Sequence, residues 1–361
     1  MRSNPPPRID LKGLAQALGL SMTTVSRALN GYSDVSEKTR RRVEQQARLL
    51  GYAPNAQARR LTSGMTETIG FVLNDVSTYY DDPYFAQLLA GMGDVLTRSN
   101  YDLVISTRGG DTDALGGYRR LVEERRVDGI VLDRTKRVDE RIDYLLDAGM
   151  PFVTFGRSEE ARRHAFLDID GEAAARMSIE RLLKLGHRRI AFLGAPGDFM
   201  YNHLRRSGYE RALAAAGIAV DPDLVVDTAH QEASGYRATL VLLHLDDPPT
   251  AILCIDDLPA MGAIRAVRSE GLEVGADVSI IGYNDIAPAA LVDPPLTTVR
   301  IDSRAAGRRL AEMLLALIAG RPASVFQEVW PPALVVRSSD GPPSGSRYYT
   351  AGLRQLAQAS E

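Results

Sequence analysis

The chain has 361 residues, of which 45% are hydrophobic and 25% are charged, and its formal net charge is −3. This composition is typical of a folded protein with two or three domains and excludes a disordered or fibrous chain. Cys254 is the only cysteine, which excludes a disulfide bond within one chain. No stretch reaches the roughly 18 apolar residues of a membrane span, and the N-terminus lacks the apolar run of a secretion signal. We therefore expect a cytoplasmic protein with no membrane partner.

The charge is unevenly distributed along the chain. Residues 1–64 contain eleven Lys/Arg and four Asp/Glu, a net charge of +7, which leaves −10 for the remainder. A basic segment joined to an acidic body predicts a polyanionic partner for the first segment only. Residues 1–7 are rich in proline, and we expect them to form a disordered tail.

The first predicted elements are two short helices separated by a glycine. Apolar residues follow helical spacing in the first helix, at Leu11, Leu14, Ala15 and Leu18. Gly19 is a natural C-terminal cap, and Ser21 can cap a second helix with Val25, Ala28 and Leu29 on its buried face. The side chains left pointing outward are Met22, Thr23, Ser26 and Arg27. A helix-turn-helix needs such a surface to enter a major groove, although a helical hairpin with a solvated face would show the same pattern.

A third helix and the residues after it favour the DNA-binding alternative. Ser36 can cap this helix, whose buried side is predicted at Val43, Ala47 and Leu50. Three segments match a single family in register: Thr24-Val25-Ser26-Arg27-Ala28-Leu29-Asn30, Val35-Ser36-Glu37-Lys38-Thr39-Arg40 and Leu50-Gly51-Tyr52-Ala53-Pro54-Asn55. With these segments the chain resembles the LacI-type (lactose-repressor/galactose-repressor) family of bacterial transcriptional regulators.

The resemblance implies a helix-turn-helix DNA-binding domain over residues 8–53 and a hinge helix over residues 54–64. The residues that it assigns to DNA contacts are Ser21, Met22, Thr23, Thr24, Ser26, Arg27, Asn30, Tyr52, Asn55, Ala58 and Leu61. Arg27 can make a bidentate contact with a guanine edge, whereas Met22 can only pack. Leu61 matches the leucine that the family inserts into the minor groove. The hinge is too short and polar for a stable isolated helix, so we expect it to fold with DNA, the alternative being a disordered linker.

From Thr68 onward, short apolar runs alternate with amphipathic helices. Predicted strands cover residues 68–73, 103–106, 129–132, 152–155, 189–193, 251–254 and 278–281. Predicted helices cover residues 84–98, 113–124, 139–147, 171–185, 204–216, 233–244, 257–270 and 304–319. Alternating units of this kind predict doubly wound parallel sheets, and there are too many units for one small sheet.

The resemblance implies that these units form a periplasmic-binding-protein-like α/β body of two lobes over residues 65–340. The chain would cross between the lobes near residues 157–168, 288–297 and 321–326. The first lobe is expected at about 65–160 and 297–322, and the second at about 161–296 and 323–340. Residues 341–361 are expected to form a solvated tail with too few apolar helix positions for a tetramerising coiled coil, which favours a homodimer.

No pattern of catalytic, metal-binding or cofactor-binding residues is recognisable in the body. The glycine segments 109–110, 116–117 and 194–197 lack the other residues of phosphate- and dinucleotide-binding loops. The five histidines are not spaced as metal ligands, and no serine lies in a nucleophile elbow. Asp256 and Asp257 are adjacent and would diverge on a helix, so they do not form an acid/base pair. We therefore expect no enzyme activity, no metal and no cofactor.

A ligand-binding cleft is better supported, because ligands of doubly wound sheets lie beyond the carboxyl ends of the strands. The candidate effector-binding residues are Asp75, Tyr79, Tyr80, Phe85, Arg205, Asp257 and Ser303. Arg205 and Asp257 match positions that hold effector hydroxyl groups in the family. A carboxylate accepts hydrogen bonds from vicinal hydroxyls and a guanidinium donates in a fixed geometry, so the pair suits a sugar. Two plainer interpretations stay open: Asp257 as a helix N-cap, and the aromatic residues as core.

The sequence therefore predicts a homodimeric DNA-binding transcriptional regulator, with a repressor favoured. It would bind a palindromic double-stranded operator, and a mono- or oligosaccharide effector would alter its operator affinity. One alternative keeps the DNA binding but makes the ligand a nucleobase corepressor. A different class, a carbohydrate-binding receptor or enzyme without a DNA role, would leave the basic N-terminal segment unexplained.

Overall fold

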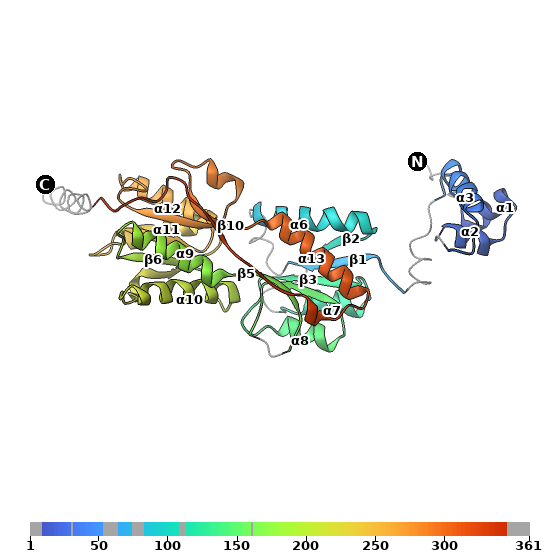
Figure 1. Cartoon of the computed structure of the whole chain (residues 1–361), viewed down its shortest axis with the longest axis horizontal. Coiled ribbons are helices and arrows are strands. Elements are labelled where there is room, and N and C mark those ends of the chain that lie inside the picture. Colours follow the sequence, from blue (N-terminus) through green and yellow to red (C-terminus); the bar gives the residue numbers. More distant parts are fainter. Residues whose placement is uncertain are drawn as a thin grey trace, which may run out of the picture. The chain divides into compact units, whose positions relative to one another are not determined.

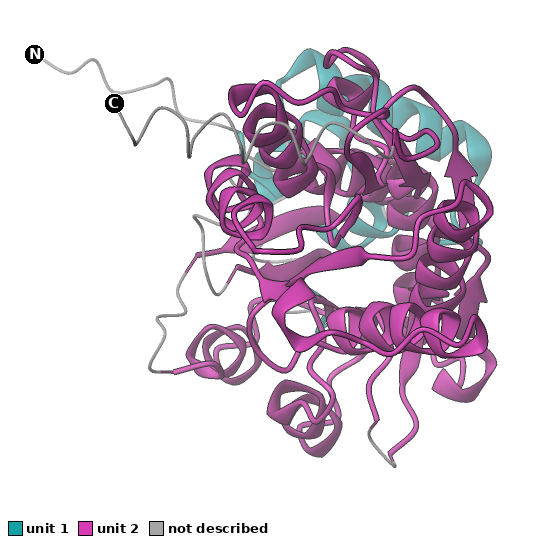
Figure 2. Cartoon of the chain, turned by 90° about the vertical axis from the view of Figure 1, so that its left-hand side faces the viewer, with its two compact units in different colours: residues 1–66 teal, residues 67–361 magenta. Residues whose placement is uncertain are grey.

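A computed structural model divides the chain into two compact units, residues 1–66 and residues 67–361, which Figure 2 shows in different colours. The structure describes residues 9–29, 32–52, 64–73, 83–107, 113–159 and 162–344. The predicted tail at residues 1–7 and nearly all of the predicted hinge helix lie outside the described residues, as do residues 345–361. We call the first unit the head and the second the body.

The head contains the three predicted helices. They are α1 (Leu11–Leu18), α2 (Met22–Leu29) and α3 (Glu37–Leu49). Gly19 caps α1 in the left-handed conformation at φ +64°, as its lack of a side chain permits. Their buried side chains form one apolar core: Leu14, Ala15, Leu18, Val25, Ala28, Val43 and Ala47. Leu50 was predicted in this core but lies after the end of α3 and is 37% exposed.

The first lobe of the body is a parallel sheet with strand order β11-β5-β4-β3-β1-β2. Its strands are β1 (Thr68–Val72), β2 (Asp102–Ser106), β3 (Gly129–Asp133), β4 (Phe152–Phe155), β5 (Ala165–Ile169) and β11 (Gln327–Trp330). Helices α6 (Pro83–Leu96) and α13 (Ser303–Ile318) pack side by side on one face (Figure 1). Helices α7 (Gly116–Glu123) and α8 (Glu140–Asp147) cover the other.

The second lobe is a sheet with strand order β12-β10-β9-β8-β6-β7, in which β12 runs antiparallel to β10. Its strands are β6 (Ile190–Gly194), β7 (Val225–Asp227), β8 (Ala251–Cys254), β9 (Ser279–Asn284), β10 (Thr297–Arg300) and β12 (Ala333–Val335). Helices α9 (Gly171–Lys184) and α10 (Met200–Ala215) cover one face. Helices α11 (Glu232–Leu243) and α12 (Asp257–Ser269) cover the other.

The chain passes between the two sheets later than predicted at each crossing. It crosses between β5 and α9, between β10 and α13, and between β11 and β12 (Figure 1). The lobe boundaries predicted after residues 160, 296 and 322 are therefore too early. The strands beside these crossings are short: at least half of the residues in β10 and in β11 are polar, and β5 and β12 contain three-residue apolar stretches that were not recognised as strands. The missed strands are β5, β7, β10, β11 and β12.

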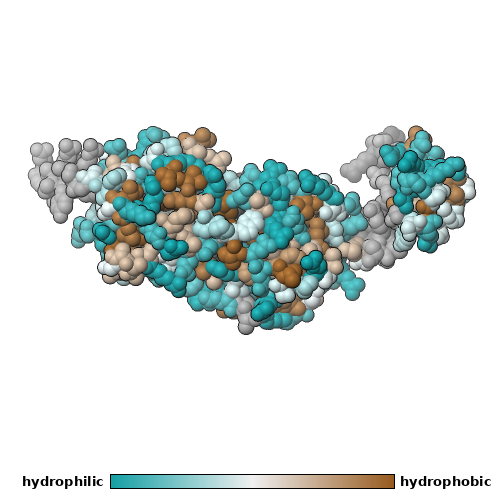
Figure 3. Space-filling model, viewed as in Figure 1, coloured by the Kyte–Doolittle hydropathy of each residue, from teal (hydrophilic) through white to brown (hydrophobic). Residues whose placement is uncertain are grey.

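The predicted solvated tail also begins later than residue 341. The Gly341 carbonyl oxygen accepts a hydrogen bond from His187 Nε2 at 2.9 Å, and Ser344 Oγ donates to Asp277 at 2.7 Å. Residues 341–344 are thus attached to the second lobe. On the face of the body seen in Figure 3, hydrophobic and hydrophilic residues are interspersed. Within the described ranges, no helix has both the length and the apolar character to cross a membrane.

Candidate ligand-binding cleft and nucleic-acid interface

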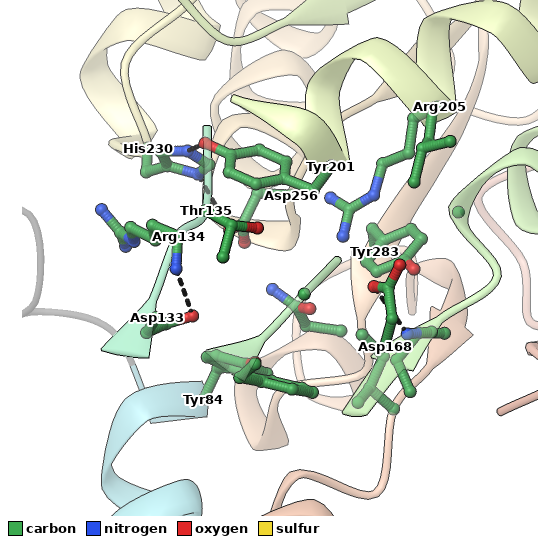
Figure 4. A pocket seen from close by; sticks show the side chains of 17 residues that line it. Tyr84, Asp133, Arg134, Thr135, Asp168, Tyr201, Arg205, His230, Asp256 and Tyr283 are labelled. Carbon is green, nitrogen blue, oxygen red and sulfur yellow. Dashed lines mark hydrogen bonds and ion pairs between the residues drawn. The ribbon is translucent and has the colours of Figure 1, made fainter. Parts of the chain in front are cut away.

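A cavity that is partly open to solvent lies between the two lobes of the body, and the empty space in it is about 690 Å³ when the open mouth is counted. Its walls come from the carboxyl ends of β3, β4, β5 and β9 and from the starts of α9, α10 and α12 (Figure 4). The lining residues with polar or aromatic side chains are Tyr84, Asp133, Arg134, Thr135, Phe155, Asp168, Tyr201, Arg205, His230, Asp256, Tyr283 and Asn284. This is the position at which open α/β sheets bind ligands.

Arg205 of α10 points into this cavity (Figure 4) and is held in place by contacts on two sides. Its Nη1 donates to the main-chain oxygen of Ile255 at 2.6 Å. Its guanidinium carbon lies 3.3 Å from the ring centre of Tyr283 and 5.3 Å from that of Tyr201. Among the described residues, its buried Nε has no hydrogen-bond partner. The guanidinium has five N–H donors and gives one to Ile255, so Arg205 can also donate to a ligand in the cavity that it lines.

Two buried carboxyl groups line the first-lobe side of the cavity. Asp133 accepts from the main-chain nitrogen of Arg134 at 2.7 Å, and burial raises its pKa. Asp168 accepts from the Ile169 nitrogen at 2.8 Å, and Arg157 Nε lies 3.1 Å from its other oxygen without hydrogen-bond geometry. Burial raises the pKa of Asp168 to about 6, although Arg157 opposes the shift. Both groups have capacity to accept hydrogen bonds from a ligand.

Three side chains from different elements form a hydrogen-bonded chain on the second-lobe side. Asp256 precedes α12, and its Oδ2 lies 3.1 Å from His230 Nδ1. The other ring nitrogen of His230 lies 2.7 Å from the hydroxyl of Tyr201 on α10. Burial opposes ionisation of Asp256, but the hydrogen bond with His230 and the charge of Arg205 keep its pKa below the usual range.

The turn after β9 presents Asn284 to the cavity in a strained backbone conformation. Asn284 and Asp285 have φ values of +109° and +54°, which non-glycine residues rarely adopt. Arg337 and Arg300 hold the Asp285 carboxylate from two sides, at 2.5 and 2.7 Å. These ion pairs stabilise a conformation that would otherwise cost about 1–3 kcal/mol, as is found in ligand-binding turns.

Asp257 lies directly behind the cleft wall and does not line the cavity. Its side chain is fully buried, accepts from the Ile286 nitrogen at 2.9 Å, and is 2.5 Å from Thr298 Oγ1. Burial raises its pKa well above the usual range. A Cβ atom on Gly282 would lie 2.2 Å from Asp257 Oδ1, so only glycine fits there. Asp257 therefore ties α12 to β10 and to the turn after β9.

In the head, α2 presents exposed side chains above the apolar core. Met22, the first residue of α2, is 49% exposed. Arg27 lies near the end of the helix, with Nη2 at 2.7 Å from Asp34 Oδ2 and its guanidinium 5.1 Å from the ring centre of Tyr32. Both Arg27 and Asp34 are about half exposed, so this ion pair leaves the arginine accessible.

Comparisons with known proteins match both units. Residues 10–55 match the bacterial regulatory proteins of the lacI family, and residues 179–339 match the periplasmic binding protein-like domain. The HTH-type transcriptional regulator AglR of Rhizobium meliloti (strain 1021) is 38% identical over 338 residues, covering 92% of this chain and 95% of AglR. The regulator RafR of Escherichia coli is 35% identical, covering 93% of this chain and 100% of RafR.

The chain belongs to the LacI family of bacterial transcriptional regulators. Solved structures agree. The CelR–cellobiose complex is 31% identical, with a TM-score of 0.70, and covers 92% of this chain and 100% of its own. The lac repressor dimer bound to operator and the anti-inducer ONPF is 28% identical, with a TM-score of 0.80, and covers 93% and 100%. The predicted family, the fold class and the role as a DNA-binding transcriptional regulator are confirmed.

The head residues predicted to contact DNA fall into three groups in this LacI-family chain. Ser21, Met22, Thr23 and Arg27 are exposed, and Ser21 Oγ caps α2 by accepting from the Thr24 nitrogen at 3.0 Å. The half-buried ones are Thr24, Ser26 and Tyr52, of which Tyr52 packs against the head core. Those outside the described residues are Asn30, Asn55, Ala58 and Leu61. Their contacts with DNA stay predictions.

In the body, the cavity contains one of the predicted effector residues, Arg205. Asp257 does not line the cavity. The residue before it, Asp256, which caps the start of α12, lines it instead. Phe85 packs edge-on against Phe71 in the core at 5.2 Å, while the preceding Tyr84 lines the cavity. Ser303 is buried at the start of α13. The remaining candidates, Asp75, Tyr79 and Tyr80, lie outside the described residues.

The residues that were missed lie at strand ends that the sequence did not mark as functional. The predicted strand ended at residue 132, whereas β3 ends at Asp133. A carboxyl group directly after a predicted strand was a signal that the sequence offered. Asp168 lies in β5, which was not predicted as a strand, and Asn284 ends a strand predicted to stop at residue 281. His230 lies in a loop and had no spacing that indicated a role.

Proposed function

We propose that this LacI-family regulator is a repressor whose operator affinity is altered by an uncharged sugar bound in the cleft, and that it turns over no substrate. The observation that carries the proposal is that three buried carboxyl groups, Asp133, Asp168 and Asp256, line the same cavity as the guanidinium of Arg205. Sugar hydroxyls both donate and accept, so one ligand can satisfy all four groups. An anionic ligand would instead be repelled by the carboxylates.

Aromatic rings around the same cavity support a carbohydrate. Tyr84 and Phe155 are stacked with ring centres 6.0 Å apart, and Tyr201 and Tyr283 flank Arg205. Flat apolar faces beside hydrogen-bonding groups are typical of small-molecule sites with defined orientation. Among the relatives, the CelR complex contains cellobiose, whereas those named PurR are 30% identical to this chain. The nucleobase corepressor, which the sequence leaves open as an alternative, is the ligand class to test against sugars.

A homodimer on a palindromic operator is the expected assembly. The edge strand β2 exposes Val104 by 41% and Ile105 by 39%, and an apolar strand edge is stabilised by pairing with a second copy. Two heads related by two-fold symmetry would read two half-sites. A protein that acts on chromosomal DNA works in the cytoplasm. Ligand binding would shift the balance between two lobe arrangements and change operator affinity by roughly 5- to 150-fold.

Calorimetry with the full-length protein tests the ligand class. The panel contains cellobiose, maltose, melibiose, glucose 6-phosphate, hypoxanthine and guanine, and chromatography of each mixture tests for turnover. We expect a neutral sugar to bind without being chemically altered. We also expect it to change the protein's affinity for an operator selected from random DNA. Binding of a nucleobase instead, or release of a hydrolysed product, would contradict the proposal.

Two neighbouring arginines of α10 provide a matched pair of variants. Arg205→Ala removes the donor in the cavity, so sugar binding should be lost while operator binding persists. Arg206→Ala removes an arginine that is 48% exposed and paired with Glu210, so it should bind the sugar as the wild type does. Equal affinities in the two variants would place the ligand outside the cleft.

A further inference from the structure

The hydrogen-bonded chain of Asp256, His230 and Tyr201 fixes the direction of each of its hydrogen bonds. Asp256 is held in its ionised form and can only accept, so His230 Nδ1 donates to it across 3.1 Å. In a neutral imidazole the second nitrogen then has no proton. Tyr201 must therefore donate its hydroxyl proton to His230 Nε2 across 2.7 Å.

This direction determines what Tyr201 can offer to a ligand. Its hydroxyl proton is used by His230, so only the oxygen lone pairs are available to the cavity. If His230 gains a proton, Nε2 becomes a donor, and the Tyr201 oxygen must accept from it. The hydroxyl proton is then free to rotate toward the cavity. Burial raises the pKa of Tyr201, so the phenol keeps its proton in both states.

We propose that His230 is a positioning residue that sets the hydrogen-bond polarity of Tyr201 in the cleft, making it an acceptor when His230 is neutral and a donor when His230 is protonated. The inference rests on the proposed sugar effector and specifies how one wall of that site selects hydroxyl groups. With neutral His230, the site requires a ligand group that donates. With protonated His230, it tolerates a ligand group that only accepts.

Charged groups from several elements face this hydrogen-bonded chain. Asp256 contacts the His230 ring directly from the start of α12, and Asp133 lies at the end of β3. The charge of Arg205 acts on Asp256 and Tyr201, and that of Arg134 acts on Tyr201. Histidine is the residue type that ordinarily gains a proton between pH 8 and pH 5, so the tests vary the pH over this range.

The first test needs no ligand. Nitrogen-15 NMR of the five histidines in the full-length protein at pH 7.5 reports the tautomer of each ring. We expect His230 to carry its proton on Nδ1, the tautomer that is less common in free histidine, and to lose this preference in Asp256→Asn. The Nε2-protonated tautomer in the wild type would overturn the inference, whether or not any sugar binds.

The second test measures selectivity for the tightest-binding sugar of the panel and its monodeoxyfluoro analogues, in which fluorine cannot donate. For one hydroxyl position, the ratio of analogue to parent Kd should fall by roughly 2- to 10-fold, the value of one hydrogen bond, between pH 8 and pH 5.5. His230→Gln should abolish this change. Asp168, whose pKa is about 6, also titrates in this range, and it is unchanged in that variant.

His244→Gln is the matched control, because this histidine is 55% exposed at the end of α11. It should keep the wild-type dependence on pH. A wild-type profile in His230→Gln, or no position that responds to pH in the wild type, would overturn the inference. If no sugar of the panel binds at any pH, the proposed function fails, and the NMR result still decides how Tyr201 is oriented.

Discussion

The DNA-binding head and the cleft present their functional groups in opposite ways. In the head, Met22 and Arg27 project from α2 above an apolar core that they do not help to form. In the cleft, Asp168 and Asp256 are less than 8% exposed, and each is hydrogen-bonded to the fold around it. We infer that function can be separated from stability at Met22 and Arg27 of the head but not in the cleft.

The largest expected effect belongs to Asp257, directly behind the cleft wall. Asp257→Ala leaves the Ile286 nitrogen and the Thr298 hydroxyl buried without their partner. We expect a loss of ~2–4 kcal/mol in the free energy of unfolding, measured by denaturant titration of the full-length protein. Asp247→Ala, at a side chain 80% exposed, is the control and should change little. If Asp257→Ala keeps wild-type stability but loses sugar binding, Asp257 contacts the ligand, contrary to this prediction.

Asp168→Asn should raise the free energy of unfolding and not lower it, because ionising this buried carboxyl group in the folded protein costs free energy. Its pKa is about 6 when folded and 3.8 ordinarily, so between these values the native state binds more protons than the unfolded state. The free energy of unfolding therefore falls as pH rises through this window. An amide cannot ionise, so the variant should be more stable by roughly 1–3 kcal/mol at pH 7.5.

Below pH 3.8 the gain from Asp168→Asn should disappear, which denaturant titrations at pH 3.5 and 7.5 can measure. Sugar affinity should fall at the same time, since the variant replaces an acceptor by an amide. A stability difference that is the same at both pH values would mean that burial of charge is not its cause, and would weaken the contrast between cleft and head.

The same contrast explains what the sequence predicted. The head core follows from helical spacing, and α1 ends at Gly19 as expected, because a local pattern determines each of these features. The cleft depends on which strands lie side by side. β10 has no continuous apolar run, and the run in β5 is only three residues long and was not recognised as a strand. Arg205 was found through the resemblance. The start of α12 at residue 257 was predicted correctly, but which of the adjacent Asp256 and Asp257 side chains lines the cavity depends on the packing around them and not on periodicity.

A smaller effect is expected for the cap of α2. Ser21 Oγ accepts from the Thr24 nitrogen at 3.0 Å, so Ser21→Ala leaves that nitrogen without its partner. Loss of an N-cap costs typically ~1 kcal/mol, and this cost should appear as faster hydrogen exchange of the α2 amides in the full-length protein. Unchanged exchange would show that the cap does not stabilise the free head. Ser21 thus tests whether a predicted DNA-contact residue at the start of α2 also supports the fold.

Arg27→Ala should have the smallest effect on stability. Arg27 and Asp34 are about half exposed, and exposed ion pairs contribute at most ~1 kcal/mol, so we expect unfolding of the head to change by less than ~0.5 kcal/mol. Asp34→Ala breaks the same ion pair but keeps the arginine, and should match Arg27→Ala in stability. Only Arg27→Ala should weaken binding to a selected operator, by ~1–3 kcal/mol if it reads a guanine edge, and much less on scrambled DNA. Equal losses on both DNAs would indicate a phosphate contact, whereas a large loss of stability in both variants would show that the head, like the cleft, uses its functional residues to hold the fold.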